Sequence, residues 1–231
     1  MQLKLLVLLR SLGFLTRGKT MRDIFNVKIE FCEVIKQVIT RAYELQRKGA
    51  IIQAQPLGMM RLALEGQNNA DSGLFLHFWA PDLPKSLKKP PLHTHVFHMR
   101  SRIIKGMITD TTYRAIPDKT GDYQLVDAEC TQEYCSMLNN LQRVRIEIES
   151  VRELVSGEIY EVPKGDFHLT SLPNDVQTAI TIMEKSMVDR VNPVLALPYK
   201  SQIDNTPFDR MQLDQKAAWK RILESLHDLI L

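Results

Sequence analysis

The chain has 231 residues, of which 44% are hydrophobic and 25% charged, so the composition excludes wholesale disorder and a fibrous architecture. Its 30 basic and 27 acidic residues give a formal charge of +3, which is too balanced for the dense basic face that nucleic-acid binding normally requires. We therefore expect one folded domain over residues 1–231 that does not bind nucleic acid.

The N-terminal segment resembles a weak signal peptide, because Lys4 precedes the apolar run of residues 5–9. Arg10 interrupts that run, and no clear small-residue cleavage site follows it. Translation from Met21 would remove the segment altogether. No stretch of the sequence approaches the roughly 20 apolar residues that cross a bilayer, so we expect no membrane contact and a cytoplasmic location.

The cysteines support the same expectation. The chain has three of them, Cys32, Cys130 and Cys135, and they form no CxxC pair. An odd number without such a pair fits a reducing compartment better than a disulfide framework. We expect all of them to be free thiols.

Hydrophobic periodicity predicts a helix over residues 22–48, since apolar residues recur there at three- and four-residue steps and Gly49 supplies a stop. Shorter apolar runs at residues 60–64 and 74–79 predict strands. Residues 81–91 contain four prolines and are predicted to be a loop that leads to His93.

The middle of the chain is predicted to be rich in strands, so that residues 57–186 form a β-barrel. The predicted strands cover residues 93–105, 106–115, 143–150, 157–162, 167–171 and 177–184. The insert at residues 117–140 is predicted to be a solvated loop or short helix, because its acidic residues form no compact ligand pattern. A last helix is predicted over residues 206–231, where an apolar stripe that includes Met211 and Trp219 covers the barrel or, alternatively, forms a homodimer contact.

Two segments carry the candidate chemistry. His93 and His95 are two residues apart, which on a strand points both imidazoles toward one face. Pro163 and Gly165 form a predicted turn before a short strand that carries His168. A neutral imidazole is a common ligand for first-row divalent metals. We therefore expect the three imidazoles to converge on one divalent ion, the alternative being ordinary hydrogen-bonded histidines without a metal.

These segments resemble the two motifs of the cupin superfamily. The first motif is matched by His93, His95 and Gly106, and the second by Gly157, Pro163, Gly165 and His168. The resemblance implies a mainly β fold, a cupin-type double-stranded β-helix or jelly-roll barrel with flanking N- and C-terminal helices. Two positions depart from the family pattern, because Met99 stands where a metal-binding glutamate is expected and Leu172 replaces an asparagine.

The missing glutamate leaves three neutral ligands, which favour an anionic group in an open coordination position. Such a site resembles the three-histidine iron centre of the thiol dioxygenase branch of cupins. The resemblance implies Fe(II), with Zn, Mn or Ni as alternatives, and an oxygenase that acts on a small thiol or carboxylate. A non-catalytic binding or sensing cupin and a metal-assisted isomerase or hydrolase remain alternatives.

Four residues near the motifs, His98, Arg102, Tyr113 and Tyr160, have two interpretations each. His98 faces away from the pair on a regular strand, but a bulge would make it a fourth ligand. Arg102 lies at the surface or, after a bulge, clamps a substrate carboxylate. Tyr113 and Tyr160 either pack or donate hydrogen bonds to a metal-bound oxygen. Met99 is expected to fill core volume.

Overall fold

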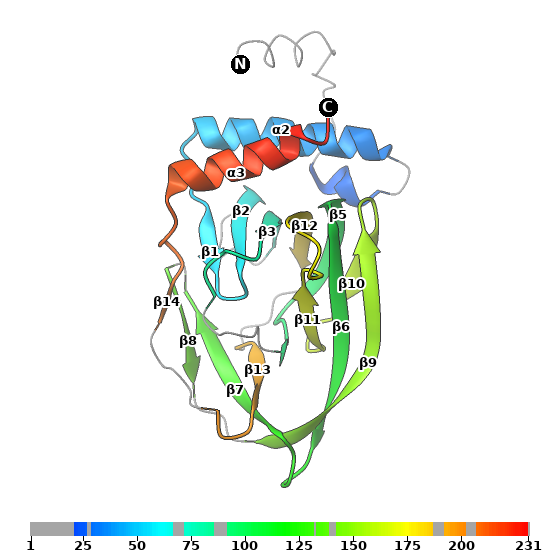
Figure 1. Cartoon of the computed structure of the whole chain (residues 1–231), viewed down its shortest axis with the longest axis vertical. Coiled ribbons are helices and arrows are strands. Elements are labelled where there is room, and N and C mark those ends of the chain that lie inside the picture. The colour runs from blue at the N-terminus through cyan, green and yellow to red at the C-terminus, as the bar shows by residue number, and fades with distance from the viewer. Residues whose placement is uncertain are drawn as a thin grey trace.

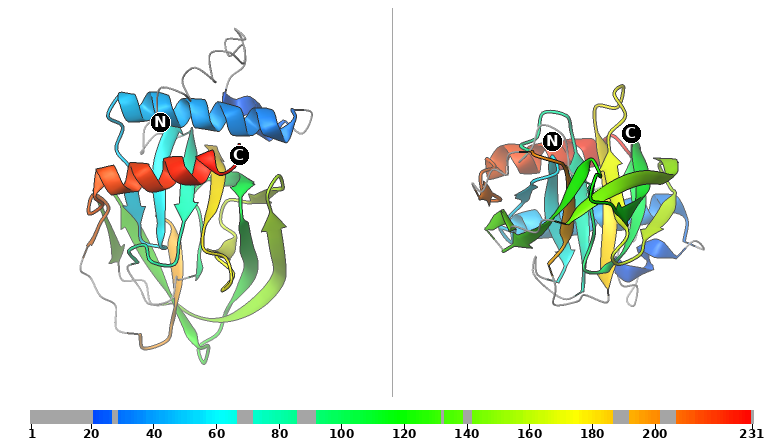
Figure 2. Two further views of the ribbon diagram at one scale, coloured as in Figure 1. Left: turned by 45° about the horizontal axis from the view of Figure 1, so that its top comes forward. Right: turned by 90° about the horizontal axis from the view of Figure 1, so that it is seen from below.

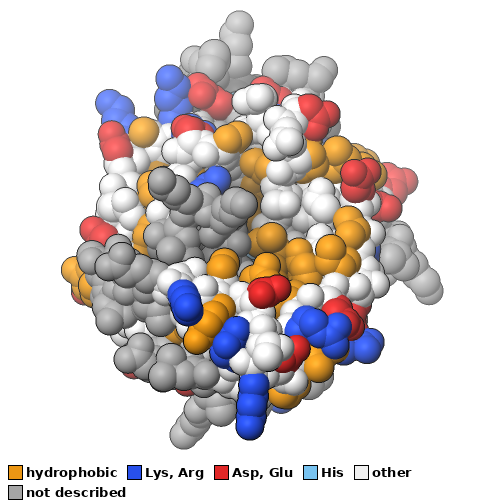
Figure 3. Space-filling view, turned by 60° about the horizontal axis from the view of Figure 1, so that its bottom comes forward, with side chains coloured by type: hydrophobic (Ala, Val, Ile, Leu, Met, Phe, Trp, Pro, Cys, Tyr) orange, Lys and Arg blue, Asp and Glu red, His pale blue; other side chains and the backbone are white. Residues whose placement is uncertain are grey.

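The computed structural model describes residues 21–26, 29–66, 72–85, 92–131, 133–138, 142–186, 192–201 and 207–230. Two helices lie side by side across one end of the molecule, and two sheets extend away from them (Figure 1). At the end opposite the helices, hydrophobic side chains gather near the middle of the surface (Figure 3). The prediction of a mainly β fold with a helix toward each end of the chain is confirmed.

The N-terminal helical region is divided. A 3-10 helix, η1 (Met21–Phe25), precedes α2 (Phe31–Arg47), and Gly49 follows with a φ of 71°, a conformation that ends helices and favours glycine. The C-terminal helix α3 (Gln215–His227) begins later than predicted. Asp214 caps it, because its carboxylate accepts hydrogen bonds from the backbone of Lys216 at 2.9 Å and of Ala217 at 3.2 Å.

The first sheet has six strands, and every neighbouring pair is antiparallel. In spatial order they are β1 (Gln53–Gln55), β2 (Met59–Glu65), β3 (Gly73–Trp79), β12 (Ala179–Ser186), β5 (His98–Lys105) and β10 (Ile159–Val162). We call this the helix-side sheet, because the helices cover its outer face (Figure 2).

The second sheet has eight strands, and we call it the distal sheet. In spatial order they are β13 (Val194–Pro198), β4 (Leu92–His93), β11 (Phe167–Ser171), β6 (Met107–Pro117), β9 (Arg143–Val155), β7 (Tyr123–Cys130), β8 (Tyr134–Leu138) and β14 (Phe208–Asp209).

The order of the central strands is that of an eight-stranded jelly roll, the arrangement found in cupins. Strands β3, β12, β5 and β10 form one layer, and β4, β11, β6 and β9 form the other. Consecutive strands β5 and β6 belong to different sheets, as do β3 and β4, so the chain passes back and forth between the layers. Strands β1 and β2 extend the helix-side sheet beyond β3, whereas in the distal sheet β13 pairs with both β4 and β7.

Two apolar clusters hold these layers. The larger one lies between the helices and the outer face of the helix-side sheet, and includes Val38, Leu62, Ile182, Trp219 and Leu226. The smaller one lies between the inner faces of the two sheets, and includes Phe75, Met99 and Met183 from one sheet with Ile108 and Leu154 from the other. The stripe on α3 therefore covers the sheet, as predicted, although Met211 lies before the helix and is exposed.

Two predictions are wrong, one about the structure of the insert between the histidine motifs and one about the state of the cysteines. Most of the insert at residues 117–140 belongs to strands β7 and β8 and not to a loop or short helix, because buried Val126 and Ala128 alternate along β7 with the more exposed Asp127 and Glu129. Cys32 is a free thiol, but Cys135 is disulfide-bonded, and its backbone pairs with that of Cys130 across the β7–β8 hairpin. The cysteines consequently give no support to a reducing compartment.

The described helices were also compared with the requirements for a membrane-spanning helix. Neither α2 nor α3 combines the length and the hydropathy that a bilayer crossing by a helix requires. The segment over residues 1–20, with the signal-like run, lies outside the described residues.

Candidate metal centre

The three motif histidines meet in the structure. His93 ends β4 and lies directly opposite His168 of β11 in the antiparallel register, so both side chains project from the same face of the distal sheet. His95 follows two residues later. One ring nitrogen from each of the three lies within 4.8 Å of the other two, and Nε2 of His95 is 2.9 Å from Nε2 of His168.

His95 reaches this position from a loop and not from a strand. The predicted strand over residues 93–105 is interrupted, because β4 ends at His93 and β5 begins at His98. The backbone carbonyl of His95 accepts a hydrogen bond from Gly165 N–H at 3.0 Å, and its ring stacks on Phe97 at 4.6 Å between centroids. The three histidines therefore converge as predicted, but a loop and not a regular strand positions His95.

A buried carboxylate, which the sequence analysis did not identify, orients one of these rings. Oδ1 of Asp110 on β6 lies 2.8 Å from Nδ1 of His168 and also accepts a hydrogen bond from the Thr170 hydroxyl at 3.0 Å. Oδ2 of Asp110 accepts one from Arg152 Nη2 at 2.6 Å. Burial alone would raise the pKa of Asp110, but the hydrogen bonds and charges of His168 and Arg152 outweigh it and lower the pKa.

The ionised Asp110 fixes the tautomer of His168. Since the carboxylate can only accept, Nδ1 of His168 carries the proton of this hydrogen bond, and Nε2, which lies toward His95, is the nitrogen left to bind a metal. Burial, followed by the charges of His168, His93 and His77, lowers the pKa of His95 well below its usual value. The His95 imidazole is therefore neutral and can act as a ligand.

These donors fit a divalent first-row ion. Neutral imidazoles are the ligands that Fe, Zn, Cu and Ni accept readily. One possible ligand nitrogen from each of the three residues lies within 4.8 Å of the other two, so a single ion could contact all of them. Among the described residues, no carboxylate or thiol joins the group of His93, His95 and His168.

His98 and Met99 do not join the cluster. Nε2 of His98 is 3.5 Å from a carboxylate oxygen of Glu161 on the neighbouring strand β10, so the proposed fourth ligand is directed elsewhere. Met99 is 5% exposed and packs in the apolar cluster between the sheets, as expected for a residue that fills volume.

Arg102 and Tyr113 also lie away from the histidines. Arg102 is buried on the outer face of the helix-side sheet, where it donates a hydrogen bond to the carbonyl of Ile24 at 2.5 Å and lies over the Phe31 ring. It is neither at the surface nor a clamp, because η1 covers it. Tyr113 alternates along β6 with Thr112, which pairs with His168, and therefore projects from the opposite face of the strand.

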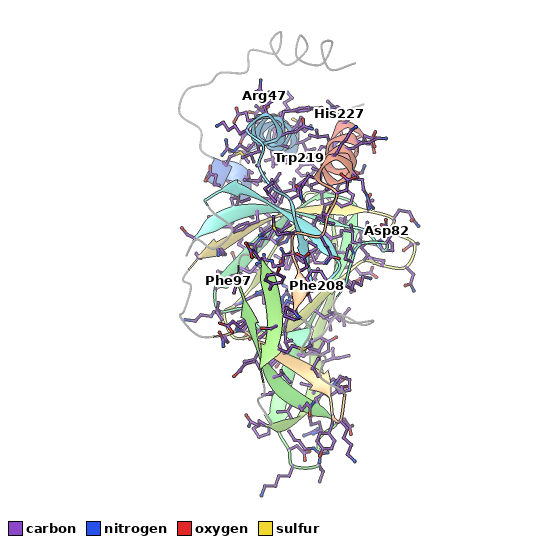
Figure 4. The ribbon with its side chains drawn as sticks, turned by 90° about the vertical axis from the view of Figure 1, so that its left-hand side faces the viewer. Arg47, Asp82, Phe97, Phe208, Trp219 and His227 are labelled. Carbon is purple, nitrogen blue, oxygen red and sulfur yellow. The ribbon has the colours of Figure 1, made fainter. Side chains whose placement is uncertain are left out.

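Tyr160 lies closer to the site. It is buried on β10 between the sheets, and its hydroxyl makes hydrogen bonds with Thr170 and Ser101. Burial raises the pKa of Tyr160 to about 12, so the hydroxyl keeps its proton. Thr170 thereby links Tyr160 to Asp110 and onward to His168. Phe97, whose ring stacks on that of His95, lies well away from Trp219 and the helices (Figure 4).

The sequence itself matches no protein-family model and no curated protein. Solved structures show distant similarity. A hydroxypropylphosphonic acid epoxidase from S. wedmorenis is 12% identical with a TM-score of 0.37, over 60% of this chain and 56% of that chain. A cupin-like protein from Thermotoga maritima is 12% identical with a TM-score of 0.35, over 65% and 83%. A cupin-2 domain from Rhodospirillum rubrum is 13% identical with a TM-score of 0.33, over 77% and 90%.

The matched region therefore spans little more than half of the epoxidase chain. The fold itself is defined by the strand order described above, which is that of a cupin-type jelly roll. Within that fold, His93, His95 and His168 form a candidate three-histidine metal centre, with Asp110 behind it.

Proposed function

We propose that this protein is a metal-dependent cupin enzyme, a non-haem iron oxygenase that acts on a small anionic substrate such as a thiol or carboxylate. The observation that supports it is the meeting of His93, His95 and His168 with no carboxylate in the same group among the described residues. Three neutral ligands leave the charge of a dication uncompensated, which favours an anion beside it.

The residues of the chain have separable tasks in this proposal. The imidazoles of His93, His95 and His168 would hold the ion, and Asp110 keeps His168 in the required tautomer. Arg152 and Thr170 hold Asp110 in place through their own hydrogen bonds. When bound, iron would supply the redox chemistry that activates dioxygen. The apolar cluster between the sheets limits access of water to the buried side of the histidines.

The first experiment determines metal content and oxygen use. Full-length protein purified without chelator is analysed for metals, loaded with Fe(II), and tested for oxygen uptake with a panel of small thiols and carboxylic acids. We expect about one ion per chain in the wild type and loss of that ion in H93A, H95A and H168A. H98A is the matched control, because His98 lies beside Glu161 outside the cluster, and it should keep the ion.

The outcomes separate the alternatives. Absence of oxygen uptake with every candidate would contradict the oxygenase. Thermal stabilisation by a small molecule without product would favour a binding or sensing cupin instead, because a ligand selective for the native state raises its stability by mass action. Turnover supported by Zn would indicate a hydrolase or isomerase, since Zn has no redox chemistry.

A further inference from the structure

Strand β13 holds the segment that carries two of the three candidate ligands. Thr94 lies between His93 and His95 and is 6% exposed. Its N–H donates to the carbonyl of Val194 at 2.8 Å, and its hydroxyl accepts a hydrogen bond from Val194 N–H at 3.0 Å. His93 itself lies opposite Leu195 of β13. The beginning of β13 therefore fixes the backbone from which both imidazoles project.

β13 is positioned in turn by β7, which lies beside it (Figure 1). The two strands pair along the whole of β13, and Val194 lies opposite Asp127. Ala128 N–H also donates to the carbonyl of Pro193 at 2.8 Å. On the other side of β13, β4 is only two residues long, so β7 supplies most of the pairing. The position of Thr94 thus depends on the end of β7 that contains Asp127 and Ala128.

A disulfide lies at this same end of β7. Cys135 on β8 is disulfide-bonded and half-buried, and its backbone lies opposite that of Cys130, the last residue of β7. Cys130 is two residues beyond Ala128. The nearby exposed residues are Glu129, Thr131, Glu133 and Tyr134. Exposed strand ends open more readily than the middle of a sheet, and a cross-link opposes that opening. The disulfide consequently stabilises the part of β7 that supports β13.

Other contacts keep the hairpin in place when the disulfide opens. Arg210 N–H donates to the carbonyl of Glu133 at 2.8 Å, and Nη1 of the same arginine donates to the carbonyl of Thr131. Phe208 of β14 pairs with Cys135 on the far side of β8. Loss of the disulfide should therefore loosen the end of β7 locally and leave the domain folded.

We propose that this disulfide is a redox switch for the candidate metal centre. Its reduction loosens the end of β7 and, through β13 and Thr94, weakens the binding of a divalent ion by His93 and His95. The inference rests on the proposed metal site for this functional effect. Residues that orient metal ligands typically change metal affinity when they are disturbed, and Thr94 orients two ligands at once.

The covalent step is thiol–disulfide exchange with an external dithiol. One thiolate of the dithiol attacks a sulfur of the protein disulfide, and the bond between Sγ of Cys135 and its partner sulfur breaks. The second thiol of the reductant then displaces the protein sulfur and closes its own disulfide. Two thiols form in the protein, and the dithiol supplies the two electrons and two protons.

The test compares oxidised and reduced protein. Full-length protein freed of metal is treated with dithiothreitol, desalted without oxygen, and compared with the untreated sample. Amide hydrogen exchange is measured, and Zn(II) is titrated in competition with a chromogenic chelator. We expect reduction to accelerate exchange at Thr94, Ala128 and Val194 and to weaken Zn(II) binding about tenfold or more. Reoxidation should restore both properties.

Variants locate the effect. C135S should reproduce the effect of reduction without any reductant. C32S is the matched control, because Cys32 is an exposed free thiol, and it should behave as the wild type does. T94V removes the hydroxyl that accepts from Val194 while the disulfide stays intact, and it should also weaken Zn(II) binding. If C135S does not fold, reduced wild type and T94V decide the question.

The two proposals fail separately. Unchanged exchange at Thr94 and Val194 after complete reduction would overturn the switch, as would unchanged Zn(II) affinity in a protein whose oxidised form binds the ion. If the oxidised protein binds no Zn(II), the metal centre is wrong, and exchange at Thr94 alone then decides whether the disulfide controls this segment.

Discussion

Asp110 and His168 lie 58 residues apart in the sequence, yet Oδ1 of the carboxylate is 2.8 Å from Nδ1 of the imidazole. The register of β6 and β11 places them on one face, because Asp110 pairs with Thr170 and His168 with Thr112. The hydrogen bond determines which nitrogen of His168 can serve as a ligand.

The substitution D110N tests this relationship. An asparagine amide lacks the negative charge and would present a donor NH₂ group to either His168 or Arg152, both of which donate to Asp110 in the wild type. We expect the affinity for Zn(II) or Fe(II) to fall about 10–100-fold, measured by competition with a chromogenic chelator. D118N is the control, because Asp118 lies in a turn where it binds Thr120. Unchanged affinity in D110N would contradict the positioning role.

His77 should make stability depend on pH. Its pKa is lowered to about 3 in the folded chain by burial and by Arg61, against about 6.5 in the unfolded chain. Between these values the unfolded state binds a proton that the folded state does not, so stability present above pH 6.5 is lost on acidification, at up to about 1.4 kcal/mol per pH unit. Urea unfolding from pH 7.5 to 5.0, with chelator present, should therefore show a steeper loss in the wild type than in H77Q. Parallel curves would refute the assignment.

Arg102 should affect stability and not metal binding. R102A removes the hydrogen bond to the carbonyl of Ile24 and the contact with Phe31, both under η1. We expect a loss of about 1–3 kcal/mol in the free energy of unfolding with unchanged metal content. The control is R114A, since Arg114 is exposed in its ion pair with Glu149 and such pairs contribute about 0–1 kcal/mol. A lower metal content in folded R102A would contradict this prediction.

Two glycines of the motifs should differ in their tolerance of alanine. Gly106 has a φ of 75°, and a Cβ there would lie 2.4 Å from the carbonyl oxygen of Thr178. Gly157 has a φ of 97°, but a Cβ would have nothing within 4 Å. G157A should cost about 1–2 kcal/mol for the left-handed backbone alone, and G106A clearly more. Thermal and urea unfolding of the pair would show this, and equal losses would exclude the contact as the cause.

Local pattern was sufficient to predict the strands that are short and bounded by turn residues. The prediction for residues 167–171 coincides with β11, because Pro163 and Gly165 mark its beginning and apolar residues alternate within it. The histidine motifs likewise predicted the meeting of His93, His95 and His168. Each of these signals is contained in a few consecutive residues.

The remaining features depend on pairing between distant segments. β9 extends to Val155, beyond the predicted end at residue 150, because β6 supplies partners along its whole length. Asp110 could not be identified beforehand, since a single aspartate within a strand resembles a solvent-facing residue until its neighbours on β11 are known. The direction of Arg102 depends in the same way on η1, which lies 78 residues earlier.

The three candidate ligands differ in how firmly the backbone holds them. His93 and His168 belong to strands that pair with each other, whereas His95 lies in the short connection between β4 and β5 and is the most exposed of the three. Displacement of His95 would break the hydrogen bond from Gly165 N–H to its carbonyl but would leave the pairing of His93 with His168 in place. Capture and release of an ion should accordingly be governed by movement around His95, and exchange kinetics should respond to substitutions at Phe97 and Gly165 while equilibrium stability of the sheets does not.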